Sequence, residues 1–233
     1  MKTAQQQPYI YAYLGLALVH LGLLLINSHG VFISLTKQSL MITLFLHYLS
    51  QTYKIQYTVI IALIFAFLGD LFLLEIWNEP IFFLLGLGSF LIMQGLYISI
   101  FWQLKRGQKG LIENNLIWLL PPIIGLLPLF IVVLPRVSAE LIIPIIFYAF
   151  SLLLTMLTAL NLQNWGLKYA VQKILWGSIT FAISDTLIAI NKFVMTIPYA
   201  SFLIMLTYIL AQGFIITGIL QATSTDSPQK YPN

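Results

Sequence analysis

Apolar segments of about membrane length follow one another along almost the whole chain. The hydrocarbon core of a bilayer is roughly 30 Å thick, and an α-helix needs about 20 residues to cross it. Candidate spans lie at about residues 9–27, 36–51, 57–76, 81–103, 114–134, 139–160, 170–191 and 199–220. Because lipid offers no partner for backbone polar groups, these segments are expected to be helical. The sequence therefore predicts an all-α, polytopic transmembrane bundle of about eight spans.

Composition excludes a soluble domain. Of the 233 residues, 60% are hydrophobic and only 8% are charged, whereas roughly a quarter of a soluble domain is charged. The connections are short, so we expect one integral-membrane domain over residues 1–222 and a short polar tail over residues 223–233. The first apolar run lacks a small-x-small cleavage site, and it is interpreted as a span rather than a removable signal peptide.

Two of the predicted spans are unusual. The second is short and begins at Lys37. The fifth contains Pro121, Pro122 and Pro128, and a proline inside a helix removes a backbone donor and clashes with the preceding turn. A kinked or broken fifth helix is therefore expected.

The distribution of basic residues predicts the orientation, because cytoplasmic loops are enriched in lysine and arginine. With eight spans, one side carries eight basic residues: Lys2, Lys54, Lys105, Arg106, Lys109, Lys168, Lys173 and Lys230. The other side carries only Lys37, Arg136 and Lys192. Both termini are therefore expected in the cytoplasm, with the protein in the cell (inner) membrane.

A short internal repeat accompanies this pattern. The sequence SFLIM at residues 89–93 in the fourth span recurs at residues 201–205 in the eighth. A parallel duplication of four spans would explain the repeat. Chance agreement between two apolar segments is the alternative.

Two aspartates interrupt the apolar spans: Asp70 in the third and Asp185 in the seventh. A charged side chain in hydrocarbon is costly, so such residues are usually paired, hydrated or functional. One interpretation is structural, with each carboxylic acid hydrogen-bonding a neighbouring helix. The other is a catalytic or proton-relay pair, which we favour, with the two groups facing one another across a polar cavity in the outer half of the membrane.

Other polar residues are expected around these aspartates. Asp185 and Lys192 are seven residues apart, so they share a helix face at a separation of about 10 Å. A cation at the mouth of the cavity could bind a phosphate, although Lys192 could also simply reach towards the interface. The candidate binding residues are Lys37, Gln94, Tyr97, Ser184, Asn191, Lys192, Tyr208 and Gln212.

Several other kinds of chemistry find little support. The chain has no cysteine, so thiolate catalysis and cysteine-bound metals are excluded. Its three histidines lack the spacing of a zinc site. The GxSxG elbow of serine hydrolases and the glycine-rich phosphate loops are missing. The scattered basic residues do not indicate nucleic-acid binding.

The segments FLGDLFLL (67–74) and ISDTLIAINKF (183–193), with TYILAQ (207–212) downstream, resemble the YhhN family of membrane proteins. That family includes the lysoplasmalogenases. The chain departs from the family pattern at Gln94, where a histidine is frequent, and after Lys37, where Gln38 and Ser39 stand near the usual position of a proline. The aspartate-containing segments are intact.

This resemblance implies a lysophospholipid substrate and hydrolysis of the vinyl-ether bond of a lysoplasmalogen. The expected products are a fatty aldehyde and a glycerophospho-ethanolamine or -choline. Such a reaction needs a general acid and a second carboxylate, here Asp70 and Asp185, and no metal or cofactor. The main alternative is a proton-coupled transporter or lipid flippase that uses the same pair as a relay. A metal-dependent amidase of the ceramidase type lacks its histidine cluster.

Overall fold

The computed structural model describes residues 8–26, 30–74, 79–105, 107–163 and 168–224. All regular structure in these ranges is helical, which confirms the predicted fold class. The α-helices are α1 (Pro8–Leu25), α2 (Val31–Gln51), α3 (Tyr57–Phe72), α4 (Pro80–Leu104), α5 (Leu111–Asn114), α6 (Leu120–Val133), α7 (Ala139–Asn161), α8 (Lys168–Phe193) and α9 (Ala200–Ser224). Most of the polar tail lies outside the described residues.

Six helical segments in the described part of the chain are long and apolar enough to cross a membrane. They are α1, α4, the continuous segment Leu116–Arg136, α7, α8 and α9. The protein is therefore a multi-pass membrane protein. The predicted spans at 36–51 and 57–76 correspond to α2, which is not apolar enough, and to α3, which has only 16 described residues.

The proline-rich fifth segment is not broken at its internal proline. The α6 helix continues through Pro128. Short 3₁₀ turns at Leu116–Leu119 and Leu134–Arg136 extend it at both ends. The change of helix type is therefore at the ends of this segment.

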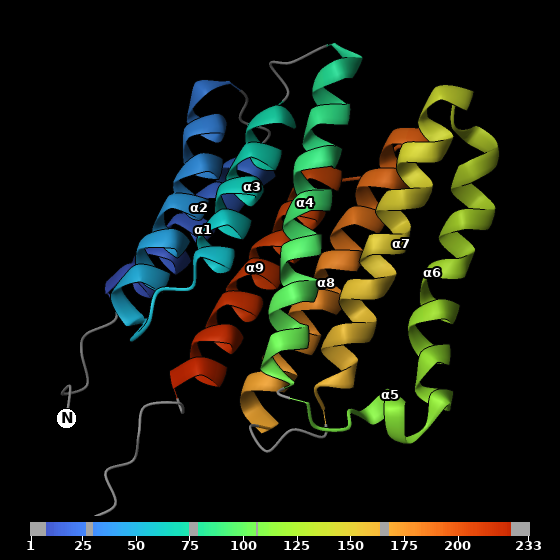
Figure 1. The fold of residues 1–233 in the computed structure, drawn as a ribbon. Coiled ribbons are helices and arrows are strands. Elements are labelled where there is room, and N and C mark those ends of the chain that lie inside the picture. Colours follow the sequence, from blue (N-terminus) through green and yellow to red (C-terminus); the bar gives the residue numbers. More distant parts are fainter. Residues whose placement is uncertain (1–7, 27–29, 75–78, 106, 164–167, 225–233) are drawn as a thin grey trace, which may run out of the picture.

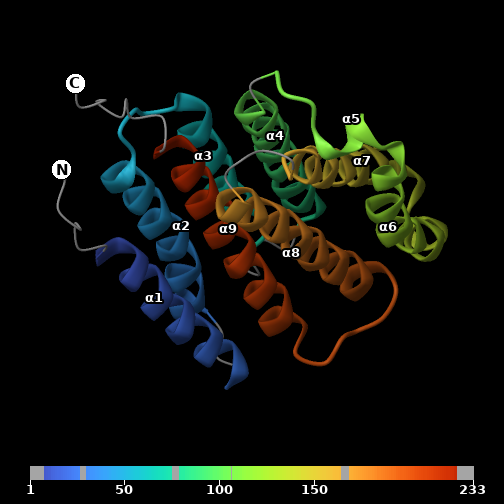
Figure 2. The same ribbon diagram turned by 90° about the horizontal axis from the view of Figure 1, so that it is seen from below.

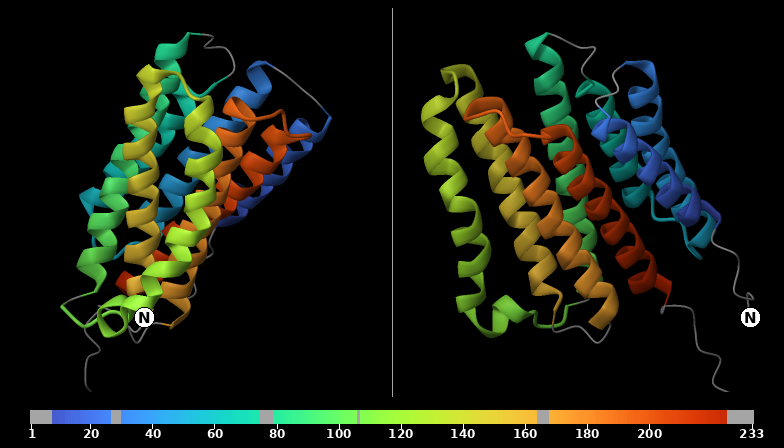
Figure 3. Two further views of the ribbon diagram at one scale, coloured as in Figure 1. Left: turned by 90° about the vertical axis from the view of Figure 1, so that its right-hand side faces the viewer. Right: turned by 180° about the vertical axis from the view of Figure 1, so that it is seen from behind.

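The helices form one bundle (Figure 1). Seen along its length, α9 lies in the middle, between α1, α2 and α3 on one side and α4, α7 and α8 on the other (Figure 2). The α6 helix forms one edge and α1 and α2 form the opposite edge (Figure 3). Large apolar side chains on α6, such as Ile124, Leu127 and Ile131, are exposed, as expected for a helix that faces lipid.

Glycines bring α8 and α9 into close contact. A Cβ atom on Gly177 would lie 2.9 Å from the backbone oxygen of Ala211, and one on Gly218 would lie 2.9 Å from that of Ala170. Small residues allow membrane helices to approach at backbone distance, where packing replaces the hydrophobic effect as the source of association. These two helices are therefore the tightest pair around the centre of the bundle.

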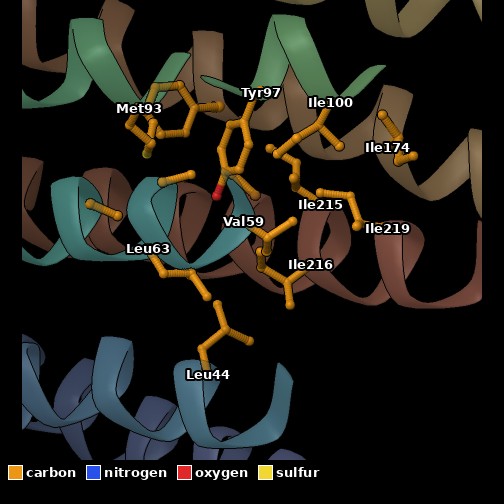
Figure 4. Packing of buried hydrophobic residues seen from close by; sticks show 14 of the residues in the cluster. Leu44, Val59, Leu63, Met93, Tyr97, Ile100, Ile174, Ile215, Ile216 and Ile219 are labelled. Atoms are coloured by element: carbon orange, nitrogen blue, oxygen red, sulfur yellow. The ribbon is translucent and has the colours of Figure 1, made fainter. Parts of the chain in front are cut away.

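The buried apolar core contains residues of α1 to α4 and of α6 to α9, and Figure 4 shows part of it. Leu44 of α2, Leu63 of α3, Tyr97 of α4, Ile174 of α8 and Ile216 of α9 are all almost completely buried. Tyr13 of α1 belongs to the same core, and its hydroxyl donates a hydrogen bond of 2.7 Å to the backbone oxygen of Ile209 in α9. The first helix is thereby attached to the central one.

Several helix ends meet at one end of the bundle, at the top of Figure 1. The α2, α4, α7 and α9 helices begin there, and α3, α6 and α8 end there. At the opposite end, Lys105 forms an ion pair with Glu113 of α5, and hydrogen bonding from Lys105 lowers the pKa of Glu113. The Ile112 amide donates to Asn161 Oδ1 at 2.9 Å, which attaches α5 to α7.

Candidate active site

Asp70 lies in the last turn of α3 and is only 3% exposed. Its Oδ2 accepts a hydrogen bond of 2.7 Å from the Tyr208 hydroxyl of α9. Its Oδ1 lies 3.5 Å from Lys37 Nζ of α2. A buried carboxylate needs such partners, because burial without them is strongly unfavourable. Asp70 is therefore held by two neighbouring helices.

The residue before Asp70 determines how closely α4 can approach. A Cβ atom on Gly69 would lie 2.7 Å from the Phe90 ring. That ring also contacts the Tyr208 ring, with 5.9 Å between the centroids. Glycine at position 69 therefore lets Phe90 pack beside the Asp70–Tyr208 pair.

Asp185 lies in α8 and is 8% exposed. Its Oδ2 accepts a hydrogen bond of 2.5 Å from the Tyr148 hydroxyl of α7. Among the described residues, no basic side chain forms an ion pair with it. The preceding Ser184 hydroxyl donates to the backbone oxygen of Ile204 at 3.0 Å, which fixes this part of α8 against α9.

Two cavities adjoin one another at the end of the bundle where α3 and α8 terminate. The first, called here the polar cavity, contains Lys37, Asn191, Lys192 and His20 in its wall. The second, called here the apolar cavity, is lined almost entirely by hydrocarbon side chains of α4, α6, α7 and α8, together with Asp185 and Tyr148. With their open mouths they enclose about 1220 and 680 Å³, respectively.

The two cavities share part of their walls. Leu73 at the end of α3, Phe83 near the start of α4 and Ile188 in α8 line both. Phe90 lines the apolar cavity and packs beside Asp70, while Lys37 lines the polar cavity and forms an ion pair with Asp70. Asp70 is thus connected to both cavities through its neighbours, and Asp185 lies in the wall of one.

The predicted head-group residues come together in the polar cavity. Lys37, Asn191 and Lys192 all line it. The Asn191 Oδ1 accepts the Ile197 amide hydrogen at 2.9 Å, which leaves the amide nitrogen of its side chain for other partners. The Lys192 Nζ lies 4.3 Å from the centroid of the Phe83 ring, a cation–π contact on the shared wall.

The remaining predicted residues form separate buried contacts. The Tyr97 hydroxyl donates to Gln212 Oε1 at 2.6 Å, and Ser151 Oγ donates to Gln94 Oε1 at 2.5 Å. Gln94, Tyr97, Tyr208 and Gln212 lie outside the walls of both cavities, although Tyr208 binds Asp70. That Asp70 and Asp185 face one another across a cavity stays a prediction.

Two residues at these sites were not anticipated as binding or catalytic groups. Tyr148 stands in the middle of an apolar span, and a buried tyrosine hydroxyl usually requires a polar partner, which is a usable signal. His20 is also in the middle of a span, but its contacts depend on how α1 packs. Within the described part of the chain, no three His, Cys, Asp or Glu side chains lie close enough together to hold a metal ion.

Comparison with known proteins gives a consistent family assignment. The model of the YhhN family matches residues 32–219. Lysoplasmalogenase TMEM86A from Homo sapiens is 29% identical over 176 residues, which are 70% of this chain and 65% of that protein. Lysoplasmalogenase TMEM86B from Sus scrofa is 31% identical over 172 residues, which are 74% of this chain and 65% of that protein. The chain thus spans about 65% of the length of these relatives. No solved structure matches.

Proposed function

Because the chain belongs to the YhhN family, as its aspartate-containing motifs predicted, we propose that it hydrolyses the vinyl-ether bond of lysoplasmalogens. The products are a fatty aldehyde and a glycerophospho-ethanolamine or -choline. Relatives of about 30% identity are named lysoplasmalogenases, which supports this choice among membrane hydrolases. The observation that carries the proposal is the pair of adjoining cavities, one polar and one apolar.

The two cavities suit a lipid with one hydrocarbon chain and an anionic head group. Two lysines and an asparagine line the polar cavity, and they can bind a phosphate. The apolar cavity offers hydrocarbon walls to a single chain, because almost every residue around it is apolar. A lysophospholipid that occupies both cavities places its glycerol near the shared wall of Leu73, Phe83 and Ile188.

The chemistry of a vinyl ether requires a proton at carbon. A general acid protonates the β-carbon, and the electron pair of the C=C bond forms the new C–H bond. The resulting oxocarbenium ion is captured by water, and the hemiacetal then collapses to the aldehyde and the free glycerol hydroxyl. A carboxylic acid and a carboxylate can perform these proton transfers.

The surroundings of the two aspartates favour different roles for them. We assign the acid to Asp185, which lies in the apolar cavity beside the expected position of the chain. We assign Asp70, which is paired with Lys37, as the carboxylate that stabilises the cation and accepts a proton from water. The Tyr148 and Tyr208 hydroxyls keep the two carboxyl groups in position.

The proposed topology has eight crossings with both termini in the cytoplasm. The α2 and α3 helices supply the two additional crossings, because α2 packs beside α1 and α9 and α3 packs beside α2 and α4 within the bundle (Figure 2). We place the protein in the cell membrane with this topology. A duplication of four spans accounts for SFLIM in α4 and its copy in α9.

The proposal is tested with purified full-length protein and a lysoplasmalogen in D₂O, with aldehyde release as the readout. The expected aldehyde carries one solvent-derived deuterium at the carbon next to its carbonyl, because the proton is delivered there. The matching alkyl-ether lysolipid, which lacks the double bond, should not react. Lipid transport into vesicles without aldehyde release would support the transporter alternative instead.

A further inference from the structure

His20 of α1 has one ring nitrogen bound and the other without a partner. The residue is 0% exposed and lines the polar cavity. Its Nδ1 lies 2.8 Å from the Thr36 hydroxyl of α2, while within the described part of the chain its Nε2 has no hydrogen-bond partner. Buried polar atoms are nearly always hydrogen-bonded, so an unpaired nitrogen in a cavity wall indicates a missing partner.

The contacts of Thr36 determine which nitrogen of His20 carries the proton. The Thr36 hydroxyl has a single hydrogen, which it donates to the backbone oxygens of Phe32 and Ile33 at 2.9 and 3.1 Å. With that hydrogen on the backbone oxygens, the Thr36 oxygen accepts a hydrogen bond from His20 Nδ1, and Nδ1 is then the protonated nitrogen. In this tautomer of the neutral ring, Nε2 presents a lone pair and can only accept a hydrogen bond.

A phosphate cannot satisfy this nitrogen, because its oxygens are themselves acceptors. The donor is an O–H or N–H group, either of water or of a ligand, so a ligand group that displaces the water must itself be a donor. An ethanolamine ammonium is disfavoured there, since Lys37 and Lys192 line the same cavity with like charge. A lysolipid has another donor, the free hydroxyl of its glycerol, which a diacyl lipid lacks.

We propose that His20 Nε2 accepts a hydrogen bond from the free glycerol hydroxyl of the lysolipid and thereby selects single-chain lipids. This inference rests on the proposed function and adds a specificity residue to it. A site built around a substrate hydroxyl strongly rejects an analogue without it, because a buried acceptor is then left unpaired.

The test measures binding rather than turnover. Full-length protein in detergent is titrated with an alkyl-ether lysophosphocholine, which has no scissile vinyl ether and no head-group donor. The same titration is repeated with its 2-deoxy and 2-methoxy analogues. Wild type should bind the hydroxyl lipid about tenfold to a hundredfold more tightly than either analogue. Equal affinity for all three lipids would overturn the inference.

Substitutions at His20 and Thr36 test whether these residues cause the discrimination between the hydroxyl lipid and its analogues. In His20→Phe, which removes the acceptor, the hydroxyl lipid and the deoxy analogue should bind with equal affinity. In Thr36→Val, which removes the acceptor for Nδ1, the discrimination should shrink. The matched control is His47→Phe, because His47 is also buried with an unpaired nitrogen but lies outside the wall of the polar cavity. This control should keep the discrimination.

The outcomes separate this inference from the proposed function. Hydroxyl discrimination that depends on His20, without aldehyde release from lysoplasmalogen, would support the inference and contradict the function. Aldehyde release by a protein that does not discriminate between the hydroxyl and deoxy lipids would support the proposed function and contradict the inference about His20. Discrimination that persists in His20→Phe would assign the hydroxyl to another residue.

Discussion

Each buried aspartate accepts a hydrogen bond from a tyrosine of another helix, Tyr208 for Asp70 and Tyr148 for Asp185. Such a hydrogen bond stabilises a carboxyl group within a membrane span, because few other polar partners are present there. The tyrosines also leave the second carboxyl oxygen of each aspartate for another contact. In Asp70 that oxygen faces Lys37. In Asp185 we expect it to contact the substrate and to carry the proton that is transferred.

The Tyr148→Phe substitution tests this positioning role. Removing the hydroxyl deletes a bond of 2.5 Å to Asp185, and we expect kcat to fall about tenfold. The matched control is Tyr97→Phe, which removes a hydroxyl bound to Gln212 away from both cavities and should leave kcat nearly unchanged. Steady-state aldehyde release measures both. Equal rates for the two variants would remove Tyr148 from the site.

The Lys192→Met substitution tests phosphate binding. A remote contact made equally in the ground and transition states affects KM rather than kcat. We therefore expect KM for lysoplasmalogen to rise several-fold to about tenfold, with kcat mostly intact. Lys173→Met, near the start of the same helix, is the control and should change neither constant. An unchanged KM in Lys192→Met would make Lys192 an interfacial anchor.

The sequence singles out Asp70 and Asp185 and places Lys37 and Tyr208 among the residues around them, but it does not predict which side chain contacts which aspartate, and it does not indicate Tyr148. Asp70 and Asp185 stand out because a charge in an apolar span is costly. The Lys37–Asp70 pair joins α2 to α3, and the Tyr208–Asp70 bond joins α9 to α3. Such contacts depend on which helices are neighbours, and helical periodicity does not carry that information.

Among the helices, α8 and α9 form the pair that supports the site. The α8 helix carries Asp185, Asn191 and Lys192, and α9 carries Tyr208. Their closeness at Gly177 and Gly218 fixes the relative height of these side chains. A small change in this crossing would therefore affect both aspartates.

The Gly177→Ala substitution is expected to lower stability by about 1–3 kcal/mol. Its Cβ would lie 2.9 Å from two backbone atoms, Ala211 O and Ile215 N, so the helices would have to separate. Gly95→Ala in α4 is the matched control, because no atom lies within 4 Å of the added Cβ. Thermal unfolding in detergent measures the difference. Equal melting temperatures would contradict close packing of α8 and α9.

The helix positions were largely predictable, since apolar length and proline placement are local properties of the chain. The predicted spans at 36–51 and 57–76 are not among the clear spans, because α2 is too polar and α3 has only 16 described residues. The α2 helix lies beside α1 and α9, and α3 lies beside α2 and α4, where neighbouring side chains can shield their polar groups (Figure 2). That shielding depends on tertiary structure, so hydropathy alone does not identify such helices as membrane spans.

For the whole molecule, the location of the site follows from the topology. Both cavities are at the end where α3 and α8 terminate. With eight crossings and cytoplasmic termini, this end lies on the outer side of the membrane. In the proposed orientation, which rests on the asymmetry of basic residues, the opposite end, with Lys105 and Lys109, lies in the cytoplasm.

Cysteine labelling tests this orientation cleanly, because the chain contains no cysteine. Gln108→Cys should react only with reagents that reach the cytoplasm, and Ser138→Cys should react with impermeant reagents added outside. Both positions are exposed, so lack of labelling reports sidedness. Labelling of both from the same side would contradict the eight-span orientation.

The most direct measurement of the central claim is aldehyde release by Asp70→Asn and Asp185→Asn variants acting on lysoplasmalogen. Asparagine keeps the size of each side chain but can neither deliver a proton as an acid nor accept one as a base, so each rate should fall by about two orders of magnitude or more. Glu113→Gln makes the same chemical change outside the spans and should keep full activity. Near wild-type rates in both aspartate variants would show that the carboxyl groups are structural.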